Sequence, residues 1–553
     1  MRISRKVWIA IPLIALLGLL YFVVLTVAAG QITRLLPGAV AEAIGGRDAD
    51  RYDVHVSDVD LSLLLNGLTV RDLTVSIDSS AVGATVEPAL VQAAHLGSLR
   101  VAGLRILPLL RGKGIYVSSI DLEGPTVSLY FPEQGERSEI PEGGEGRSEV
   151  DVRPTEFRPP RTNLRRVRIQ SGSIDLTRFT DRGMLTSLLR DLDLTLTEIE
   201  IDSVTFANPV QALANSRVTI AFDTVYHVLD DSLYFVAATD VRADSRDSVV
   251  EIGSVGFTPT LEAAPFFGRL PKRADRLNVR AGPIRIEGLD FANYIRDEAV
   301  GVRLVRVDSL DLQVYSDIAL DWGPKALPCR YHMGFAGIPI PFRIDTVRLV
   351  DGSIRYSELA KGSESPGQLE FDGVNGTVVN LTNDPERMTA TTPAIAQLGA
   401  RLYGAGPVTA TIRYPLRSST LDFDVEASLG AMSLVPANRF ATNVTGVEVK
   451  EGQLDSLWVG FESRDGKATG RIHMRYRDLD FRIIDRNTGK EMAWHSVLGF
   501  LGNVALRSSN PGKPEDEPRD GRIDYTCAED DIVFFEYLVG AMVSGIKRVV
   551  LII

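Results

Sequence analysis

Paired aspartates are the residues whose type and spacing come closest to a chemical site. Two carboxylates at positions i and i+2 of a strand lie on one face, as a metal ion or a general acid and base would require. Such pairs include Asp58 with Asp60, Asp191 with Asp193, and Asp422 with Asp424. Each pair occupies polar positions of an alternating stretch, so we interpret these aspartates as parts of a solvated outer face.

The other candidate motifs are incomplete. Lys113 lies between glycines in Arg111-Gly-Lys-Gly114, but the strand-to-helix context and the Ser or Thr of a phosphate-binding loop are missing. We interpret this segment as a basic turn. His227 and His473 are single histidines within strand patterns, where a structural role is expected. The sequence contains no nucleophile elbow, zinc signature or dinucleotide fingerprint, and therefore predicts no enzyme, no metal and no cofactor.

Composition sets the class of protein that positions these residues. The chain has 553 residues, of which 44% are hydrophobic and 24% charged, as in a folded protein. Its length exceeds one ordinary core, so several domains or an elongated repetitive structure is required. The net charge of −12 argues against nucleic acid as a partner. Cys329 and Cys527 are the two cysteines, and in an oxidising compartment they could form a disulfide.

The first residues predict a membrane anchor. Residues 7–29 are apolar and uncharged, and as a helix they would reach roughly 35 Å, enough to span a bilayer core. Basic residues within 1–6 place that tail in the cytoplasm and the rest of the chain across the membrane. A cleaved signal peptide is the alternative, although its apolar region would be shorter. The predicted anchor residues are Val7, Trp8, Leu13, Leu16, Leu20, Phe22 and Leu25.

Strands follow the anchor. Residues 30–52 have a helical apolar pattern and predict a collar helix at the membrane surface, whereas residues 53–506 alternate between apolar and polar side chains, as strands with one apolar face do. Within this domain, residues 132–160 predict a flexible insertion. Residues 507–522 predict a linker. The expected class is mainly β: an elongated, curved antiparallel sheet with few short helices.

Two local patterns refine this prediction. The apolar parity changes between Leu196 and Ile199, which requires a bulge or bend near Thr197. A segment with a central glycine, at 167–174, recurs at 347–354 and more loosely at 447–454, and we interpret each copy as strand, turn and strand. A second echo pairs 107–131 with 293–315, which suggests partial internal duplication.

Residues 523–553 predict a strand and a C-terminal apolar, amphipathic helix. That helix could lie at a membrane interface, cap the end of the sheet, or dock on a partner helix. Its apolar positions follow helical spacing: Phe534, Phe535, Leu538, Met542 and Ile546.

The apolar strand faces need a cover. A second sheet or helices would give a dry core, but few helices are predicted, so a lipid acyl chain is the other candidate. Because each methylene in water costs about 0.8 kcal/mol, an apolar groove would remove a barrier on the order of 10 kcal/mol for a chain of about 16 carbons. Candidate groove residues are Ile120, Leu122, Val127, Leu129, Leu192, Leu194, Leu421, Phe423, Leu479 and Phe481.

The N-terminal part resembles a known family. Residues 56–63 with 67–75, followed by 107–125 and its terminal Gly-Pro, are similar to the N-terminal signature of AsmA-like proteins, and 435–452 resembles the C-terminal part of that family. The resemblance implies a single-pass inner-membrane protein whose bulk lies in the periplasm, with a taco-like or tubular repeating β-groove related to bridge-like lipid-transfer proteins. It implies no catalytic residues.

Two functions follow as hypotheses. The first is a non-enzymatic protein that binds or conducts lipid, with phospholipid the expected cargo, between inner and outer membrane and contributes to outer-membrane biogenesis. The alternative is a periplasmic scaffold or assembly factor for outer-membrane proteins, with a dry β core. An extracytoplasmic hydrolase has no supporting residues.

Overall fold

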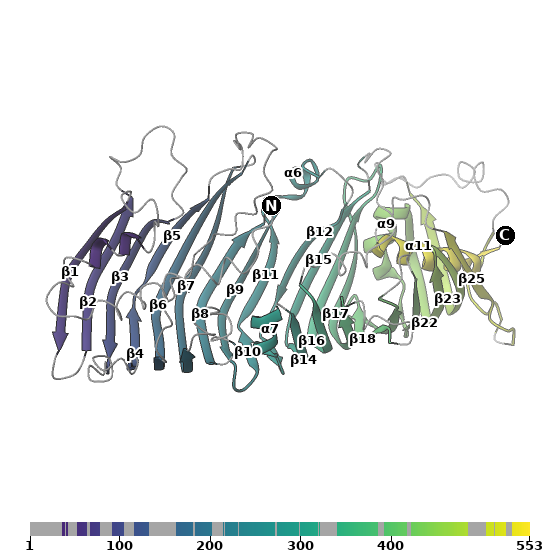
Figure 1. Ribbon diagram of the computed structural model, residues 1–553. Helices are drawn as coiled ribbons and strands as arrows, with labels where there is room; N and C mark the ends of the chain where they lie inside the picture. The colour runs from purple at the N-terminus through teal and green to yellow at the C-terminus, as the bar shows by residue number, and fades with distance from the viewer. Residues whose placement is uncertain are drawn as a thin grey trace, which may run out of the picture. The chain divides into compact units, whose positions relative to one another are not determined.

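Two compact units make up the chain in the computed structural model (Figure 1). The first unit contains Met1–Ser232 with Val236–Val250, and the second contains Leu233–Phe235 with Glu251–Ile553. The structure describes residues 36–38, 40–42, 52–62, 67–77, 91–103, 116–131, 162–180, 183–201, 214, 216–229, 232–270, 274–297, 299–318, 320, 340–384, 392–416, 422–484, 505–513, 515–526 and 534–552.

Several predicted features lie outside the described residues. These are the anchor at 7–29, the insertion at 132–160, and the two cysteines Cys329 and Cys527. Within the described part of the chain, no helix combines the length and the apolar composition that a membrane span needs.

The first unit is a sheet built from strands in chain order. β1 pairs with β2, and β2 with β3, all antiparallel. β6, β7 and β8 continue the sheet, again antiparallel. The strands are β1 (Tyr52–Ser62), β2 (Gly67–Ile77), β3 (Val91–Ala102), β4 (Tyr116–Glu123), β5 (Thr126–Phe131), β6 (Thr162–Thr180), β7 (Gly183–Ile201) and β8 (Arg217–Val228). β9 (Tyr234–Asp244) and β10 (Val249–Ile252) contain the division between the units.

The second unit continues the same construction. β11 pairs with β12, β12 with β15, and β13 with β14. From β16 onward each large strand pairs antiparallel with the next, through β23 to β25. Its strands are β11 (Ser254–Pro259), β12 (Arg276–Ala281), β13 (Ile284–Glu287), β14 (Val300–Val307), β15 (Leu310–Asp317), β16 (Phe342–Leu359), β17 (Gly367–Thr382), β18 (Ala394–Leu402), β19 (Gly406–Tyr414), β20 (Phe423–Leu429), β21 (Met432–Ser433), β22 (Val447–Arg464), β23 (Lys467–Ile483), β24 (Ala505–Leu506), β25 (Asp520–Thr526) and β26 (Leu551–Ile552).

Short helices accompany these strands. In the second unit they are α6 (Ala263–Phe267), α7 (Phe291–Asp297), the 3₁₀ turn η2 (Val435–Ala437), α9 (Asn438–Thr445) and α11 (Phe534–Val550). In the first unit, residues 36–38 and 40–42 are helical, within the predicted collar segment. β25 begins at Asp520, so the strand starts inside the predicted linker, and α11 is the predicted C-terminal helix.

The sheets are mixed rather than purely antiparallel, which corrects the prediction. β4 and β5 lie end to end, both antiparallel to β3 and both parallel to β6. β14 and β15 repeat this arrangement against β16. Parallel pairing requires a long crossover, and the chain supplies one between β5 and β6 and another between β15 and β16. The shared arrangement agrees with the predicted internal echo.

Left-handed residues bend the strands where the apolar parity changes. Glu198 has φ of 60°, and Leu196 and Ile199 on either side of it are both buried, which confirms the bend predicted near Thr197. Asp72 (φ 48°) does the same between Val70 and Leu73 in β2. In each strand two residues separate the buried apolar side chains instead of one, and the left-handed residue is exposed. The apolar side chains on both sides of it therefore stay on the same face of the sheet, which we call the inner face.

The recurring glycine segments are bulges, not turns. Each glycine lies inside one continuous strand, β6, β16 or β22, and the register with the neighbouring strand shifts there. Ser171 and Asp351, which precede the glycines of β6 and β16, have φ of 52° and 54°. The predicted turns are therefore wrong: a turn would need the chain to reverse, whereas each of these segments continues as one strand.

Candidate functional site

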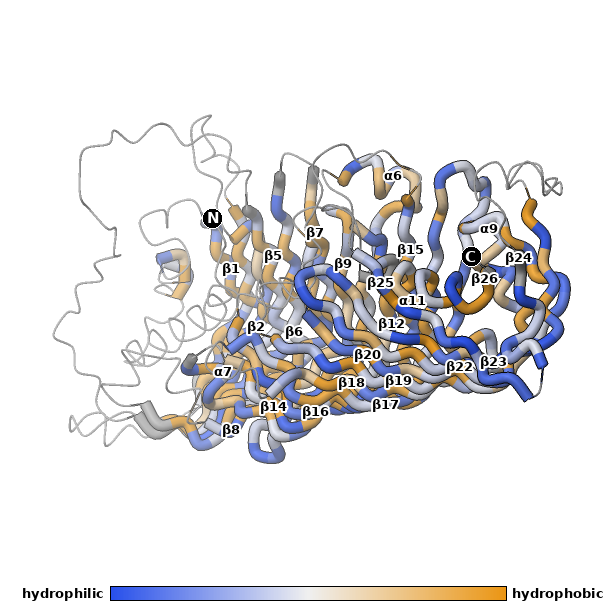
Figure 2. The backbone as a smooth tube through the Cα atoms, turned by 90° about the vertical axis from the view of Figure 1, so that its right-hand side faces the viewer, coloured by the Kyte–Doolittle hydropathy of each residue, from blue (hydrophilic) through white to orange (hydrophobic). Residues whose placement is uncertain are grey.

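The inner face of the first unit is one apolar cluster. Side chains from β1–β4 and β6–β8 form it, and Figure 2 shows apolar and polar residues alternating along the strands. Leu36 and Val40 of the collar helix belong to the same cluster as Leu68 and Val70. The helix that we predicted at the membrane surface therefore packs on the sheet, and its position relative to a membrane remains a prediction.

The predicted groove residues divide between the two units. In the first unit, Ile120, Leu122 and Leu194 join the same cluster. Leu129 is buried on β5, whereas Val127 and Leu192 are half-buried and lie outside that cluster. In the second unit, Phe423, Leu479 and Phe481 belong to a separate cluster, and Leu421 lies outside the described residues.

Ion pairs cover the outer face of the first unit. Arg166 contacts Asp121 at 3.1 Å and Arg217 contacts Asp244 at 3.2 Å, each between neighbouring strands. Burial opposes ionisation of Asp244, but hydrogen bonds from the Arg246 amide and the Arg217 guanidinium hold its pKa below the usual value. The outer face therefore has paired charges, opposite an apolar inner face.

The paired aspartates lie at exposed or half-exposed positions in both units. Asp58 pairs with Arg71, and Asp424 with Arg464 at 2.7 Å. Asp193 and Asp422 each accept a backbone amide hydrogen bond. Among the described residues, no group of three His, Cys, Asp or Glu side chains is placed to hold a metal ion. Their solvated, structural role was predicted from the polar parity.

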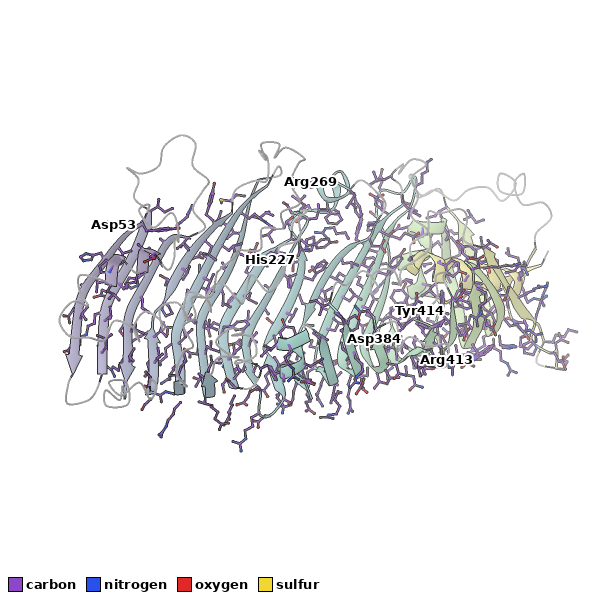
Figure 3. All side chains as sticks on the ribbon, viewed as in Figure 1. Asp53, His227, Arg269, Asp384, Arg413 and Tyr414 are labelled. Carbon is purple, nitrogen blue, oxygen red and sulfur yellow. The ribbon has the colours of Figure 1, made fainter. Side chains whose placement is uncertain are left out.

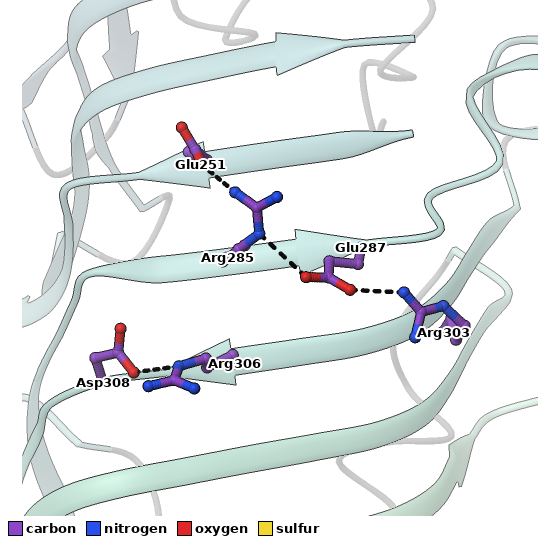
Figure 4. Close-up of polar contacts among 6 residues, drawn as sticks. All are labelled: Glu251, Arg285, Glu287, Arg303, Arg306 and Asp308. Carbon is purple, nitrogen blue, oxygen red and sulfur yellow. Dashed lines mark hydrogen bonds and ion pairs between the residues drawn. The ribbon is translucent and has the colours of Figure 1, made fainter. Parts of the chain in front are cut away.

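A charged ladder crosses the outer face of the second unit (Figure 4). Arg285 pairs with Glu251 on one side and with Glu287, at 3.1 Å, on the other. Glu287 also contacts Arg303 at 2.6 Å. Hydrogen bonds from Arg285 and then Arg303 lower the pKa of Glu287. Glu287 is thus held by two guanidinium groups, which favour its charged form.

Helices cover the inner face at the C-terminal end of the second unit. Phe423, which is 0% exposed, packs against Tyr537 of α11, and the Tyr537 hydroxyl shares a 2.9 Å hydrogen bond with Ser463. Leu538, Met542 and Ile546 pack against the same cluster. The sheet-capping alternative for the C-terminal helix matches this packing. Phe534 and Phe535 begin α11, but their side chains lie outside the description.

α9 covers the inner face over the middle strands of the second unit. Phe440 of α9 packs against Tyr356 of β16 and Val314 of β15. The Tyr356 hydroxyl donates a 2.7 Å hydrogen bond to the buried Glu358 carboxylate. A buried carboxylate in an otherwise apolar face is stabilised by such a donor.

The two histidines have different surroundings. His227, labelled in Figure 3, lies 2.6 Å from the buried Ser187 hydroxyl, which fits its predicted structural role. His473 lies on the outer face, where its Nδ1 is 2.6 Å from Asp520 and its ring is 5.1 Å from that of Trp458. These three residues could not be connected from the sequence, because they come together only through strand pairing. Trp458 at a polar position of β22 was the available signal.

Comparisons of the chain with protein-family models, with curated proteins and with solved structures give no match. The resemblance to AsmA-like proteins therefore rests on short segments of this sequence alone.

Proposed function

We propose that this protein binds the acyl chains of lipids along the apolar inner face of its sheet and conducts them without chemical change. The observation that carries the proposal is the division of the strands into two faces. One face of the first unit is an apolar cluster shared by β1–β4 and β6–β8, and the other has arginine–carboxylate pairs between strands.

The energetics favour an acyl chain on such a face. Each methylene removed from water contributes about 0.8 kcal/mol, and a continuous surface accepts a chain without positional preference. A series of equivalent apolar strands then lets a bound chain move between similar positions, because no single contact dominates. Aromatic anchors or convergent polar groups, which fix a small ligand in one orientation, are not needed for this role.

The cellular setting is part of the proposal. The predicted anchor at 7–29 and the AsmA-like resemblance support an inner-membrane protein working in the periplasm. Its cargo would be phospholipid or another envelope lipid, and its partners outer-membrane or envelope assembly proteins. The lipid-binding surface is assigned to the first unit. The inner face of the second unit is covered over β20 to β25 by α11, and Phe423, Leu479 and Phe481 have a packing role there.

Photo-crosslinking from single positions tests the proposal. Leu194 and Thr195 are neighbours in β7, but only Leu194 belongs to the apolar cluster. A benzophenone amino acid is placed at position 194 or at position 195 of the full-length protein in its own membrane. We expect lipid adducts from position 194 and few from position 195. Equal labelling at both positions, or none at 194, would overturn it.

A substitution with a matched control supports the crosslinking. Leu194→Asp should reduce the lipid found by native mass spectrometry, whereas Thr195→Asp should not. Comparison of both variants by circular dichroism separates lost binding from lost folding.

The second candidate, a scaffold with a dry core, is favoured by one observation. The cluster beneath α11 is closed by its own helix, as in an ordinary packed domain. A folded full-length protein that carries no lipid and gives no adducts at position 194 would support this role in place of lipid binding.

A further inference from the structure

A row of four side chains crosses the outer face of the second unit. Ser428 of β20 lies opposite Trp458 of β22, Trp458 opposite His473 of β23, and His473 opposite Asp520 of β25. The residues flanking His473 in β23, Ile472 and Met474, are buried in the cluster that α11 covers. Because side chains alternate along a strand, the row faces away from α11.

The Trp458 indole lies flat on the sheet. A Cβ atom at Gly460, two residues along the same strand, would come within 2.4 Å of Trp458 Cη2 and 2.7 Å of Cζ2. Only a glycine leaves this space, so the indole covers the backbone at 460. Trp458 is still 38% exposed, and the His473 ring lies beside it at an angle of 35°. The result is a flat aromatic surface open to solvent.

Polar groups surround this surface. His473 and Asp520 are joined by a 2.6 Å contact, and their side chains are 48% and 44% exposed. A pocket of about 560 Å³ lies along the row, and its lining includes Ser428, Trp458, His473, Arg475, Pro518 and Asp520. Hydroxyl, imidazole and carboxylate groups together can donate and accept hydrogen bonds with a polyhydroxylated ligand.

Three arginines near the row have no carboxylate partner among the described residues. Arg475 lines the pocket, and Arg471 and Arg522 lie directly opposite each other on β23 and β25, one row from Trp458. Nearby arginines on the same sheet are paired, as Arg477 is with Asp455 at 3.3 Å and Arg464 with Asp424. Unpaired guanidinium groups are suited to bind a carboxylate or a phosphate.

We propose that this surface binds an acidic glycan. The C–H face of a sugar ring stacks on the Trp458 indole, its hydroxyls bond to His473, Asp520 and Ser428, and its carboxylate or phosphate contacts the arginines. Aromatic rings with arginines also suit single-stranded nucleic acid. The Asp520 carboxylate within the row and the net charge of −12 disfavour such a polyanion. This site is separate from the lipid-binding face and does not depend on it.

Titration of the full chain with defined probes tests the proposal. The probes are the disaccharide of N-acetylglucosamine and N-acetylmuramic acid, which carries a carboxylate; glucosamine disaccharide 1,4′-bisphosphate; neutral chitobiose; inorganic phosphate; and a thymidine oligonucleotide. Calorimetry and tryptophan fluorescence report binding. We expect one or both acidic disaccharides to bind more tightly than chitobiose and phosphate, and the preferred probe distinguishes a carboxylate from a phosphate source.

Variants assign the binding to this surface. Trp458→Ala and Arg475→Gln should each weaken binding of the acidic disaccharide by about tenfold, and Gly460→Val should do so by displacing the indole. Arg477→Gln, at an arginine already paired with Asp455, is the matched control and should have little effect. Trp458→Phe retains an aromatic ring and should bind more tightly than Trp458→Ala, which guards against a general folding defect.

Several results would overturn the proposal. These are no binding of either acidic disaccharide, binding of phosphate as tight as that of the bisphosphate sugar, preferential binding of the oligonucleotide, or equal losses in Arg477→Gln and Arg475→Gln.

Discussion

Phe423 of β20 and Tyr537 of α11 meet edge to face, with ring centroids 6.0 Å apart and ring planes at 73°. This contact joins a strand to a helix more than a hundred residues later and closes the inner face over the last strands. Edge-to-face pairs of buried rings add to the stability that burial of their area provides. The C-terminal helix is therefore part of the core of the second unit.

Close packing of α11 predicts that its glycines cannot be enlarged. A Cβ atom at Gly545 would lie 2.8 Å from Ile472 Cδ1 and 2.9 Å from Ile523 Cγ1. We expect Gly545→Leu to separate the helix from the sheet and to lower the free energy of unfolding by about 1–3 kcal/mol. Limited proteolysis within α11 and thermal unfolding measure this effect. Lys547→Ala, at an exposed position of the same helix, is the control; equal stability of the two variants would contradict the prediction.

The charged ladder predicts a dependence of stability on acid. The pKa of Glu287 is lowered in the folded state relative to that of a glutamate in the unfolded chain, about 4.3. The contribution of Glu287 to folding stability is therefore present above about pH 4.3 and is lost as pH falls through the folded pKa. Glu287→Gln should lower the melting temperature near pH 7, and this difference should shrink as pH falls below about 4. Glu364→Gln, at an exposed residue outside the ladder, serves as control. A difference independent of pH would refute the prediction.

Tyr476 predicts a change at alkaline pH. Burial raises its pKa to about 12, and its hydroxyl donates a 2.9 Å hydrogen bond to the Arg507 carbonyl. Tyr476→Phe should cost about 1 kcal/mol at neutral pH. The pKa of a tyrosine in the unfolded chain is about 10, so this contribution to stability is complete below about pH 10 and is lost as pH rises through the folded pKa. The difference in unfolding free energy between the wild-type protein and Tyr476→Phe should therefore narrow between about pH 10 and 12. Urea unfolding of both proteins across this pH range measures the difference in unfolding free energy. A difference that stays constant with pH would contradict the prediction.

The left-handed conformation at Asp72 predicts which residues are tolerated there. A β-branched side chain is strongly disfavoured at φ of 48°, whereas glycine and asparagine adopt it readily. Asp72→Val should destabilise the first unit by about 1–2 kcal/mol, and Asp72→Asn should be nearly neutral. Hydrogen exchange of the β2 and β3 amides would report the loss. Equal protection in both variants would show that the strand accepts another path.

Strand alternation predicted the mainly β class and the bend near Thr197, because both follow from which side chains must face inward. It did not predict the parallel pairing of β4 and β5 with β6. Parallel and antiparallel strands with one apolar face share the same period, so alternation cannot distinguish them. The glycine at 172 was interpreted as a turn because glycine serves both turns and bulges.

The groove candidates show where local patterns end. Parity correctly placed Ile120, Leu122 and Leu194 on one apolar face. The alternation also placed Phe423 on an apolar strand face, but no residue near it in the sequence indicated that α11 covers that face. The row at Trp458 was missed for a related reason, since cross-strand neighbours depend on register, and register is set by bulges and turns along the whole sheet.

The end-to-end strands β4–β5 and β14–β15, each parallel to the strand that follows the crossover, suggest how such a protein gains length. A segment of this kind touches only its immediate neighbours, so an inserted copy needs no repacking elsewhere. Duplication of the segment would extend the apolar face by whole modules with its register intact. The number of strands that share the apolar face is then set by copy number, a property that evolution can change in a single recombination event.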